Sequence, residues 1–395
     1  MKVQTMHNPR RICAVTASRA DYVKIKSVLA ALTRAPGVEL QIIVTGSHLL
    51  RNYDRTIELI RQDRFPISYT AYIEIDGRVP VTMAKSTGLG VSELATAFHN
   101  LEPDIVILHG DRYEILAAAV AASLMNIFIA HIEGGEVSGT IDEHIRHAIT
   151  KFAHLHFPTT PRARDLILQL GERPADVLCV GCPGVDLLLK TEPVPLRDIE
   201  KIVHTRYTKE ERKIPLENGF ILCVQHPVTT EYYQTTDQIC ETLAALAEIG
   251  LPVLMLWPNI DAGADDISQA IRIFKLDRAH SFLSVFRNFP PEMFYNIVRH
   301  AAVMVGNSSA GIREAPYFGT PVVNIGTRQQ GRAHGKNVMH AGYNRDDIVR
   351  AIRAQLHHGK YPPEQIYGDG GAGERIAAVL KTVDPSVIQK HIKYG

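Results

Sequence analysis

The sequence predicts two doubly wound α/β domains in tandem, and two observations support this prediction. Short apolar runs rich in β-branched residues alternate with segments whose apolar residues recur every three to four positions, which is typical of βαβ units on a parallel sheet. The alternation stops after residue 189, where a charged stretch with two prolines follows, and it restarts near residue 220. The expected units are a first domain over 1–189, a connection with a helix over 190–217, a second domain over 218–370, and a C-terminal helical segment over 371–395 that packs back on the first domain.

In the first domain, each expected strand is a short apolar run. These strands cover 12–15, 40–45, 104–108, 127–132 and 177–180. Helices over 53–62 and 91–100 are expected between them, because their apolar residues share one helical face. The apolar segment 115–132 is long enough to suggest a membrane span, but it contains Asn126 and His131. We therefore expect a buried helix that ends near Asn126, followed by a buried strand.

The second domain repeats this alternation. Its expected strands cover 220–224, 252–257, 282–285, 302–305 and 321–325. In open sheets of this type, ligands bind outside the carboxyl ends of the strands. With two such sheets in one chain, the cleft between them is the expected place for the active site.

The composition limits the classes of partner. The 395 residues carry a formal net charge of +1 and are 45% apolar, so neither nucleic acid nor an anionic membrane is indicated as a partner. The N-terminal residues include basic side chains, but no apolar stretch with a small-residue cleavage site follows, so no secretory signal is expected. Five cysteines, an odd number on hydrophobic segments, indicate reduced thiols. We therefore expect a cytoplasmic protein.

The most informative segment is 131–147, which follows an apolar run. It contains four carboxylates, three imidazoles and an Arg, which is more typical of a site than of a core. Within it, Asp142 and Arg146 lie four residues apart, as do Glu143 and His147, so each pair would share one face of a helix. Two ordinary ion pairs on the surface of that helix are the alternative to a catalytic role for Asp142.

A second polar motif contains Asp111 and Arg112, and it follows the preceding expected strand. If the strands before the two motifs are neighbours, about 4.8 Å apart, their carboxyl-end loops bring Asp111, His131 and Glu133 together. Paired carboxylates in a dry pocket have pKa values that are pushed apart, so one can act as an acid and the other as a base. A simple ion pair between Asp111 and Arg112 is the alternative.

Two further loops are candidates for anion binding. Arg19 lies where a dinucleotide-binding protein would have its Gly-x-Gly-x-x-Gly turn, and it could bind a phosphate or pair with Asp21. Ser308 and Ser309 stand between a strand and a helix, where they could bind an anion or serve as a plain N-cap. Glu314, farther along, could accept hydrogen bonds from the two hydroxyls of a ribose.

We expect no metal and no cofactor. His131 and Glu133, with Cys179 and Cys182 downstream, superficially resemble the ligand pattern of a zinc deaminase. Leu178 stands where that pattern requires Pro, and a single Cys-x-x-Cys is weak support for a metal site.

A series of motifs in this order resembles the hydrolysing UDP-N-acetylglucosamine 2-epimerases, the enzymes that open sialic acid synthesis and form the epimerase half of the bifunctional animal enzyme. The resemblance runs from about residue 11 to about residue 380, and agreement over so many separated loops is more specific than any single motif. The motifs are RADY at 19–22, GSH at 46–48, HGDR at 109–112, the segment 131–142, IRHAITK at 145–151, QHPVTT at 225–230, PNIDAG at 258–263, GNSS at 306–309 and YGDG at 367–370.

The resemblance implies a fold and a reaction. The family has the two-domain glycosyltransferase-B arrangement, which agrees with the organisation described above. Its reaction removes the proton at C2 of the sugar and eliminates UDP in the anti sense, giving a 2-acetamidoglucal. Water then adds with inverted C2 configuration, so that UDP and free N-acetylmannosamine leave. Such an elimination needs a base near C2, charge stabilisation at the departing diphosphate, and an acid.

The resemblance also implies roles for individual residues. Asp111, Glu133 and Asp142 would carry the proton transfers, with the acid and base steps left unassigned among them. His226 would neutralise the leaving diphosphate. The residues implied around the nucleotide are Arg19, Arg112, Asn259, Ser308, Ser309, Glu314 and Arg328. The implied partners are a UDP-sugar substrate and further copies of the chain, as a dimer or tetramer.

Three alternatives remain open at this stage. A sister enzyme uses UDP-2,4-diacetamido-2,4,6-trideoxyglucose in legionaminic acid synthesis and shares these motifs. The non-hydrolysing epimerases, which return UDP-N-acetylmannosamine, are disfavoured because they have Glu-Ala-Gly where Glu133-Gly-Gly135 stands here. An inactive UDP-sugar binding protein is the third alternative, and the set of Asp111, Glu133 and Asp142 argues against it.

Overall fold

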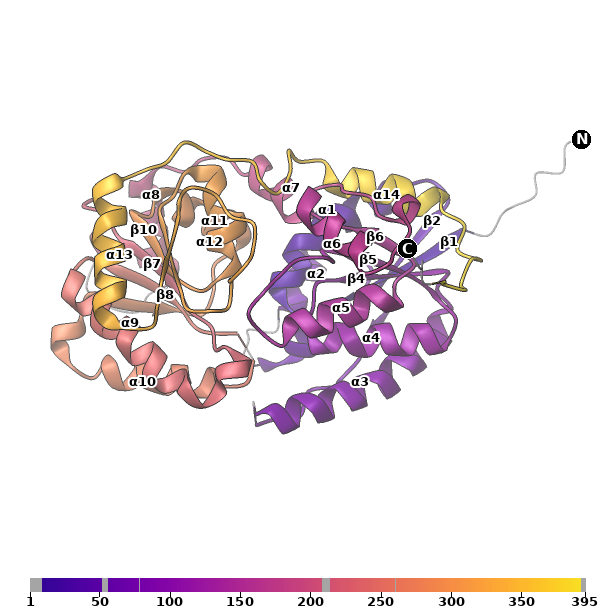
Figure 1. The fold of residues 1–395 in the computed structure, drawn as a ribbon, viewed down its shortest axis with the longest axis horizontal. Coiled ribbons are helices and arrows are strands. Elements are labelled where there is room, and N and C mark those ends of the chain that lie inside the picture. The colour runs from indigo at the N-terminus through magenta and orange to yellow at the C-terminus, as the bar shows by residue number, and fades with distance from the viewer. Residues whose placement is uncertain (1–8, 52–55, 78, 208–213, 260, 392–395) are drawn as a thin grey trace, which may run out of the picture.

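The computed structural model contains two six-stranded sheets, and all strand pairs within them are parallel (Figure 1). The structure describes residues 9–51, 56–77, 79–207, 214–259 and 261–391. The first sheet has the order β3-β2-β1-β4-β5-β6 and the second the order β9-β8-β7-β10-β11-β12, so each is doubly wound in the same way. The strands are β1 Arg10–Thr16, β2 Val38–Val44, β3 Tyr69–Thr70, β4 Ile105–His109, β5 Phe128–Ile132, β6 Leu155–Phe157, β7 Ile221–Val224, β8 Val253–Leu256, β9 Leu283–Phe286, β10 Val303–Gly306, β11 Val322–Ile325 and β12 Val338–Ala341.

Helices connect the parallel strands and cover the sheets. They are α1 Arg19–Arg34, α2 Ile57–Gln62, α3 Pro80–Leu101, α4 Tyr113–Leu124, α5 Asp142–Phe152, α6 Pro161–Gln169, α7 Pro183–Lys190, α8 Leu196–Ile202, α9 Thr235–Ile249, α10 Ala264–Phe274, α11 Pro291–His300, α12 Ser309–Arg313, α13 Arg345–His358 and α14 Ala372–Thr382. A π-helical turn, Val203–Tyr207, continues α8. Thus the chain forms two α/β domains, each built on its own parallel sheet, as the sequence predicts.

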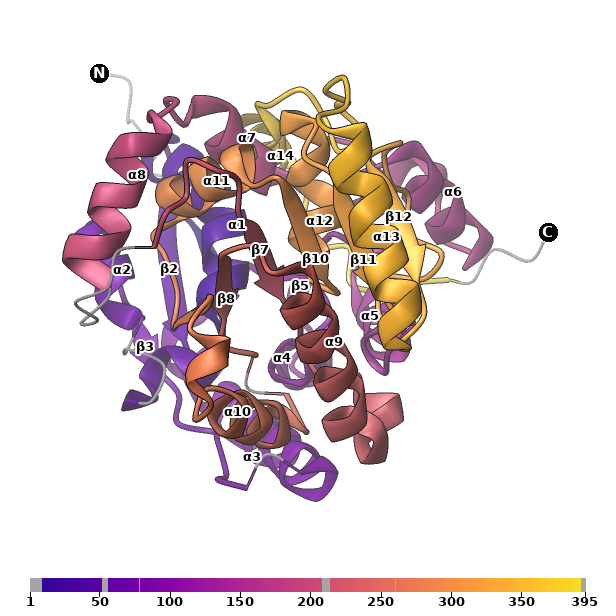
Figure 2. The ribbon, with the colours of Figure 1, turned by 90° about the vertical axis from the view of Figure 1, so that its left-hand side faces the viewer.

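Both faces of the first sheet are covered, which explains why its strands are continuous apolar runs rather than alternating ones. Ile12 and Ala14 of β1 pack with α1, α2 and α14, whereas Cys13 and Val15 pack on the side of α3, α4 and α5. In the second sheet, α9, α10 and α13 cover one face, and α8, α11 and α12 cover the other (Figures 1 and 2).

The chain crosses between the two sheets twice (Figure 1). It leaves the first sheet through α7 and α8, and it returns after α13 to place α14 against α1. Ile376 and Leu380 of α14 join the hydrophobic cluster on the α1 side of the first sheet. The Asp186 carboxylate of α7 fixes the start of α14 by accepting hydrogen bonds from the N–H groups of Ala372 (3.0 Å) and Gly373 (2.8 Å).

One expected strand is wrong. Within 177–180, only Val177 makes an isolated bridge, to His156, and the sixth place in the sheet belongs to β6. The segment still lies beside β6, since the N–H groups of Leu178 and Val180 donate to the carbonyls of His156 (2.9 Å) and Pro158 (3.3 Å). Beyond it, the N–H of Cys182 donates to the carbonyl of Tyr367 (2.8 Å), in the segment that leads to α14.

Other differences concern short elements and boundaries. β3 and β12 were not expected, because β3 has two residues and the two middle side chains of β12 are exposed. The helix expected over 53–62 is α2, which begins at Ile57, and residues 53–55 lie outside the described part of the chain. The expected helix and strand within 115–132 are α4 and β5. Within the described residues 371–391, the C-terminal segment is helical over α14 alone.

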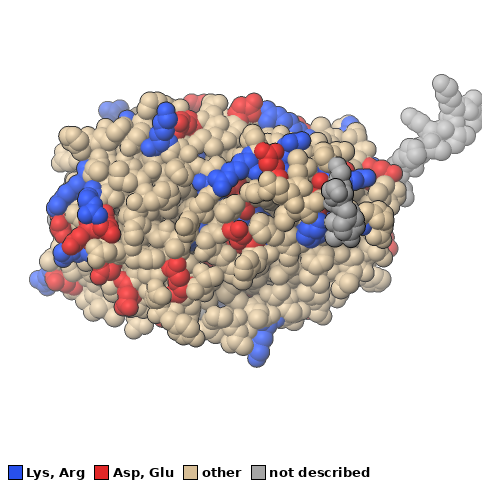
Figure 3. All heavy atoms as spheres, viewed as in Figure 1, with Lys and Arg blue, Asp and Glu red and all other residues tan. Residues whose placement is uncertain are grey.

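The surface shown in Figure 3 carries basic and acidic side chains interspersed, in keeping with the net charge of +1. None of the helices in the described ranges has the length and apolar character that a membrane crossing requires.

Candidate active site

A cavity of about 780 Å³ lies between the two sheets, and it is lined by loops that follow the carboxyl ends of strands in both. β4 and β5 are adjacent, so the Asp111 and Glu133 loops meet at this edge, as expected. The residues of the cavity wall that the sequence predicts for the site are Arg19, Asp111, Arg112, Glu133, Asp142, His226, Asn259, Ser308, Ser309, Glu314 and Arg328.

Glu133 is held by an unusual backbone conformation. It follows β5 with a φ of 68°, in the left-handed region that costs a non-glycine residue about 1–2 kcal/mol. Its N–H donates to the carbonyl of Phe157 (3.1 Å), which ties it to β6. Gly135 completes the turn, because a Cβ atom there would lie 2.1 Å from the carbonyl oxygen of Ala163. Strain of this kind is concentrated at functional sites.

Cationic and polar groups from both domains surround the Glu133 carboxylate. The Arg313 guanidinium contacts Oε2, and Lys24 Nζ and His109 Nε2 lie 3.5 and 3.3 Å from the same oxygen. The Cys182 thiol donates to Oε1 at 3.0 Å. Burial alone would raise the pKa of Glu133, but Arg313 and then Lys24 outweigh it and hold that pKa well below its ordinary value.

Asp111 is ionised by a different partner. Arg146 Nε donates to Asp111 Oδ2 at 3.0 Å, and Arg146 Nη2 contacts the same oxygen. Arg146 is buried and also donates to the carbonyl of Glu136 (2.6 Å) and to the Ser138 hydroxyl (3.1 Å). Burial would raise the pKa of Asp111, but the charges of Arg146 and then Arg332 lower it below its ordinary value.

Asp142 differs from Asp111 and Glu133 in that its pKa is raised. It is the first residue of α5, and its Oδ2 accepts a hydrogen bond from the Thr140 hydroxyl at 2.9 Å. Burial first, and then the charges of Asp111 and Asp261, raise the pKa of Asp142 to about 6. The cavity therefore combines two ionised carboxylates with one that is partly protonated near neutral pH, which is a pattern suited to acid and base steps.

The structure decides between alternatives that the sequence leaves open. Asp111 pairs with Arg146 rather than with Arg112. Arg146 is therefore a buried partner of Asp111 and not a surface partner of Asp142. The other helical pair, Glu143 with His147, does lie within 3.5 Å, as an ordinary i,i+4 contact.

Arg112 joins two acidic residues across the cleft. Its Nε and Nη2 donate to the Glu114 carboxylate at 3.1 and 2.9 Å, and its Nη1 donates to Asp261 Oδ1 at 2.9 Å. Complete burial raises the pKa of Glu114 to about 7, although Arg112 opposes this shift. For Asp261, burial would raise the pKa, but Arg112 and Arg328 outweigh it and lower the pKa. Arg112 is thus oriented on both sides before any substrate phosphate arrives.

His226 is a neutral donor. Its Nδ1 accepts a hydrogen bond from the N–H of Asn259 (3.1 Å), which assigns the ring proton to Nε2. Burial, and then the charge of Arg328, lower the pKa of His226 to about 3. Asn307 fixes the backbone, since it accepts from the N–H of His226 (2.7 Å) and donates to its carbonyl (2.8 Å). A diphosphate would therefore meet an N–H donor here, not a charged imidazolium.

The remaining predicted residues line the second-domain side of the cavity. Ser308 is the N-cap of α12, since its side chain accepts from the N–H of Ala310 (3.3 Å), and it also lines the cavity. Glu314 Oε2 is buried without a hydrogen-bond partner, and burial raises the pKa of Glu314. Arg328 donates to the carbonyl of Asn307 (3.3 Å).

Arg19 reaches across to the second domain. Its Nη1 donates to the carbonyl of Phe289, between β9 and α11. Asp21 closes a capping box with Ser18 at the start of α1, with the N–H of Ser18 donating to Asp21 Oδ1 at 2.9 Å.

Several residues of the site were not identified from the sequence. Lys24, Asp261, Arg313 and Arg332 line the cavity, and Glu114 lies directly behind it on Arg112. Asp261 lies within the PNIDAG motif at 258–263, and Arg313 lies beside Glu314. Cys182 was considered only as a metal ligand, but its partner is Glu133. Over the described ranges, no three or more His, Cys, Asp or Glu side chains are grouped as a metal site would require.

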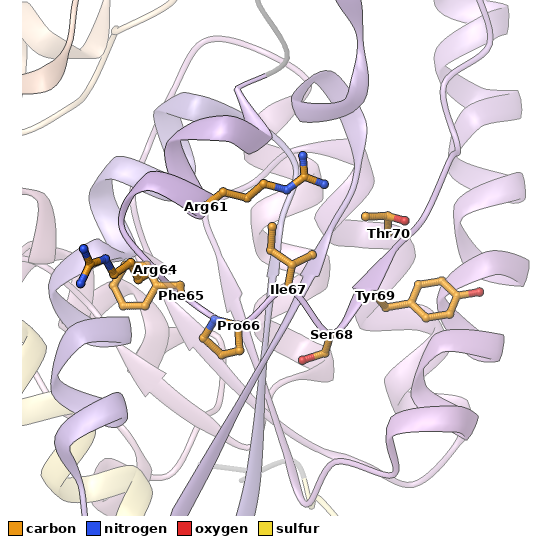
Figure 4. Close-up of a pocket in the computed structure, with 8 residues that line it drawn as sticks. All are labelled: Arg61, Arg64, Phe65, Pro66, Ile67, Ser68, Tyr69 and Thr70. Carbon is orange, nitrogen blue, oxygen red and sulfur yellow. The ribbon is translucent and has the colours of Figure 1, made fainter.

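A second cavity, of about 650 Å³, lies in the first domain between α2 and β3 (Figure 4). All its lining residues come from the single segment 61–70, and it shares none with the cleft. Arg61 within it is already paired with Glu58 (2.6 Å). This cavity has no convergent carboxylates and is not a candidate active site.

Comparison with known proteins points to one family. The sequence profile described as UDP-N-acetylglucosamine 2-epimerase matches residues 30–381. A Neisseria meningitidis UDP-N-acetylglucosamine 2-epimerase is 34% identical over 374 residues, covering 94% of this chain and 95% of the relative. A Legionella pneumophila UDP-N,N'-diacetylbacillosamine 2-epimerase (hydrolyzing) is also 34% identical over 374 residues, covering 95% of this chain and 96% of the relative.

Solved structures agree on the fold. The structure of S. aureus MnaA with UDP has a TM-score of 0.74 at 19% identity, covering 98% of this chain and 100% of that chain. A Methanocaldococcus jannaschii UDP-GlcNAc 2-epimerase in complex with UDP-GlcNAc and UDP has a TM-score of 0.74 at 18% identity, covering 94% of this chain and 99% of that chain. Both match the two-domain arrangement described above.

Proposed function

The chain belongs to the UDP-N-acetylglucosamine 2-epimerase family, and on that premise we propose that it is a hydrolysing 2-epimerase. The proposed reaction converts UDP-N-acetylglucosamine to UDP and free N-acetylmannosamine through a 2-acetamidoglucal, in sialic acid biosynthesis. The observation that carries the proposal is the cluster of Asp111, Glu133 and Asp142 in one cavity with separated protonation states. Simple binding of an anionic nucleotide sugar needs no such cluster, which argues against an inactive binding protein.

The elimination step needs a base and a stabilised leaving group. Asp111 and Glu133 are ionised, so either carboxylate can accept the proton from C2. The electrons of the C2–H bond then form the C1–C2 double bond as the C1–O bond to UDP breaks. His226 Nε2–H and the guanidinium groups of Arg112 and Arg328 would stabilise the charge on the departing diphosphate.

The hydration step needs a proton donor for C2 and a base for water. Asp142 suits both, because a pKa of about 6 leaves part of its population protonated near neutral pH. In our proposal it gives its proton to C2 and takes one from the water that adds to C1, so its protonation state is restored. The carboxylate that accepted the first proton releases it to solvent when the products leave.

Several side chains are proposed to bind the nucleotide. Glu314 has a buried oxygen without a partner, which suits acceptance of hydrogen bonds from the ribose hydroxyls. The other proposed contacts of UDP are Arg19, Asn259, Ser308 and Ser309. No cofactor is part of the proposed reaction.

The turn after Glu133 favours the hydrolysing subclass. A Cβ atom at Gly134 would lie 2.9 Å from the Thr150 hydroxyl oxygen and 3.0 Å from His131 Nδ1. The Ala that the non-hydrolysing enzymes carry at this place would thus force a shift in this chain. The names of relatives support the same proposal, since the Legionella protein is described as hydrolyzing and an Escherichia coli relative as polysialic acid biosynthesis protein P7.

A second substrate has equal support from the relatives. The Legionella protein, named for UDP-N,N'-diacetylbacillosamine, matches this chain at the same 34% identity as the Neisseria protein. The alternative proposal is therefore a hydrolysing 2-epimerase for UDP-2,4-diacetamido-2,4,6-trideoxyglucose.

Proton NMR in deuterated water tests the proposed function. The purified protein is mixed with UDP-N-acetylglucosamine, and the anomeric and C2 signals are followed. We expect release of UDP together with N-acetylmannosamine that is deuterated at C2. Turnover of only the 2,4-diacetamido sugar nucleotide would support the alternative substrate, and no turnover of either would favour the binding protein.

We also propose that the protein forms a homo-oligomer, a dimer or tetramer, as the family resemblance implies. Sedimentation velocity over a range of concentrations measures this directly, and a monomer at micromolar concentration would contradict it.

A further inference from the structure

A buried ion pair joins the two domains at Glu133. Arg313 belongs to α12 in the second domain, and its Nη1 contacts Oε2 of Glu133, which follows β5 in the first domain. Its Nη2 lies 3.6 Å from Oε2 of Glu136. The guanidinium is 2% exposed and lies 5.2 Å above the ring of Tyr367. Among the described residues, Arg313 Nε is buried without a hydrogen-bond partner.

The charged and titratable groups that face Glu133 come from both sides of the cleft. They are Lys24 of α1 at 3.5 Å, His109 of β4 at 3.3 Å, Cys182 before α7 at 3.0 Å, Arg313 of α12 in direct contact, and Glu314 at longer range. Among these groups, Arg313 lowers the pKa of Glu133 most, and Lys24 has the next largest effect.

A deeply buried carboxylate stays ionised only beside a close cation. Since the Arg313 contact spans the cleft, it exists only while the two domains are together. Separation of the domains would leave Glu133 with the weaker contacts of the first domain, namely Lys24 and His109. The protonation state of Glu133 therefore depends on the position of the second domain.

We propose that Arg313 is a positioning residue that holds Glu133 as an ionised and oriented base only when the two domains close. The base then becomes competent after the substrate is enclosed and not in the open cleft. This inference rests on the proposed function, because it assigns Glu133 a step in that reaction.

The test compares Arg313→Met with Arg313→Lys in the full-length protein. Arg313→Met removes the charge but keeps an apolar side chain, and we expect kcat at pH 7 to fall about tenfold or more with little change in KM. The acidic limb of the kcat profile should move up by about one pH unit, because burial raises the pKa of Glu133 without its partner. Arg313→Lys should restore the position of that limb. An Arg313→Met profile that is lowered equally at every pH would overturn the proposal.

Arg375→Met is the matched control. Arg375 also connects separate segments, since its Nη1 donates to the carbonyl of Val180 (2.8 Å) and its Nη2 pairs with Asp369 (2.7 Å), but it does not line the cavity. We expect its pH profile to match that of the unaltered protein. A limb shift in this variant equal to that of Arg313→Met would count against a specific role of Arg313.

Calorimetry of UDP binding gives a readout that does not depend on turnover. Titrations near pH 4.5, the ordinary pKa of a Glu carboxyl, in two buffers of different ionisation enthalpy yield the number of protons exchanged on binding. The unaltered protein should release more protons than Arg313→Met, because closure ionises Glu133, and measurable UDP binding shows that the variant is folded. Equal proton exchange in both proteins would overturn this inference alone, whereas an unaltered protein without epimerase activity would instead contradict the proposed function.

Discussion

At Glu133 the protein combines backbone strain with a buried charge. The left-handed φ of 68° and the burial of the carboxylate are each unfavourable, and neither is needed to build a doubly wound sheet. At another strand end in the cavity, after β4, the left-handed position is occupied by a glycine, Gly110. Glu133 lies in the cavity beside three side chains that can carry a positive charge. A catalytic role is the best explanation for an unfavourable residue in that place.

Single-atom replacements at the ionised carboxylates should separate catalysis from binding. Asp111→Asn and Glu133→Gln each remove a base and should lower kcat by at least about a hundredfold, while UDP still binds with similar affinity. Turnover is measured by UDP release and affinity by calorimetry. Because each change leaves a buried Arg without its partner, circular dichroism must first show that both variants are folded. Near-normal turnover in both would rule out the proposed site.

Asp142→Asn should make the protein more stable and less active. Because the folded-state pKa of about 6 lies above the ordinary value of 3.8, the native state binds more protons than the unfolded chain between these values. Stability from this group is therefore present below pH 3.8 and is lost as the pH rises through 6. At pH 8, Asn should raise the free energy of unfolding by about 1–2 kcal/mol, with turnover reduced about a hundredfold or more.

Urea unfolding at pH 8 and pH 4 measures this effect. The stabilisation should appear at pH 8 and nearly vanish at pH 4, where Asp142 is protonated in the native state. An equal gain at both pH values would show that ordinary packing, and not the Asp142 charge, is responsible.

At the scale of elements, contacts fix α5 at both ends. Asp142 lies at its N-terminal end, and the C-terminal segment of the chain binds its other end. Arg146 anchors its first turns to Asp111. At the other end, Lys390 from the C-terminal segment donates to the carbonyls of Lys151 (3.0 Å) and Ala153 and pairs with Glu172 (2.9 Å). A cation on the last carbonyls of a helix is favourable, so the C-terminal segment stabilises the helix that carries Asp142.

Lys390→Met should therefore loosen α5. We expect a loss of about 1–3 kcal/mol in the free energy of unfolding, because the carbonyls of Thr150, Lys151 and Ala153 and the Glu172 carboxylate lose a half-buried partner. A fall of a few-fold in kcat should accompany it, because Asp142 lies at the other end of the helix. Chemical denaturation and steady-state kinetics measure the two effects.

Lys360→Met provides the comparison. Lys360 makes the same kind of contact at the end of α11, to the carbonyls of Arg299 (2.8 Å) and Ala301 (3.2 Å), but α11 carries no catalytic carboxylate. A similar loss of stability with unchanged kcat is expected. If both variants lost kcat equally, the link between the C-terminal segment and Asp142 would be disproved.

The sequence predicts elements and strand-end residues better than it predicts their partners. Asp111 and Glu133 could be placed together because adjacent parallel strands end at one edge, a rule that needs no coordinates. Arg313 could not be assigned to Glu133, because that contact depends on how the two domains pack. Lys24 could not be assigned to it, because that contact depends on how α1 lies against the loop after β5. β3 could not be predicted, because two residues carry no periodicity. The run 177–180 has strand composition, but it makes only one isolated bridge beside β6, and how long such a pairing continues is set by tertiary packing.

At the scale of the whole molecule, loops of both domains touch through backbone groups beside the cavity. The N–H of Gly139 donates to the carbonyl of Arg328 (3.2 Å), and its carbonyl accepts from the Thr230 hydroxyl (3.4 Å). A Cβ atom at Gly139 would lie 2.0 Å from the carbonyl oxygen of Thr327. Only glycine permits this approach, so position 139 sets how far the cleft can close.

UDP should close the two domains, and Gly139→Val should oppose closure. Small-angle scattering is expected to show a smaller radius of gyration for the unaltered protein when UDP is added. Gly139→Val should show no such change and bind UDP about tenfold more weakly, because its closed form is less populated. An unaltered protein whose scattering does not respond to UDP would contradict domain closure.

The return of α14 to the first domain has a consequence for the order of synthesis. The first sheet is complete once β6 has left the ribosome, but the part of its core that packs against α14 stays uncovered until α14 follows, about 190 residues after α7 ends. At roughly 5–20 residues per second, this interval lasts about 10–40 s. During it the nascent chain exposes part of its first core while it makes its second, so the domain that begins first is finished last.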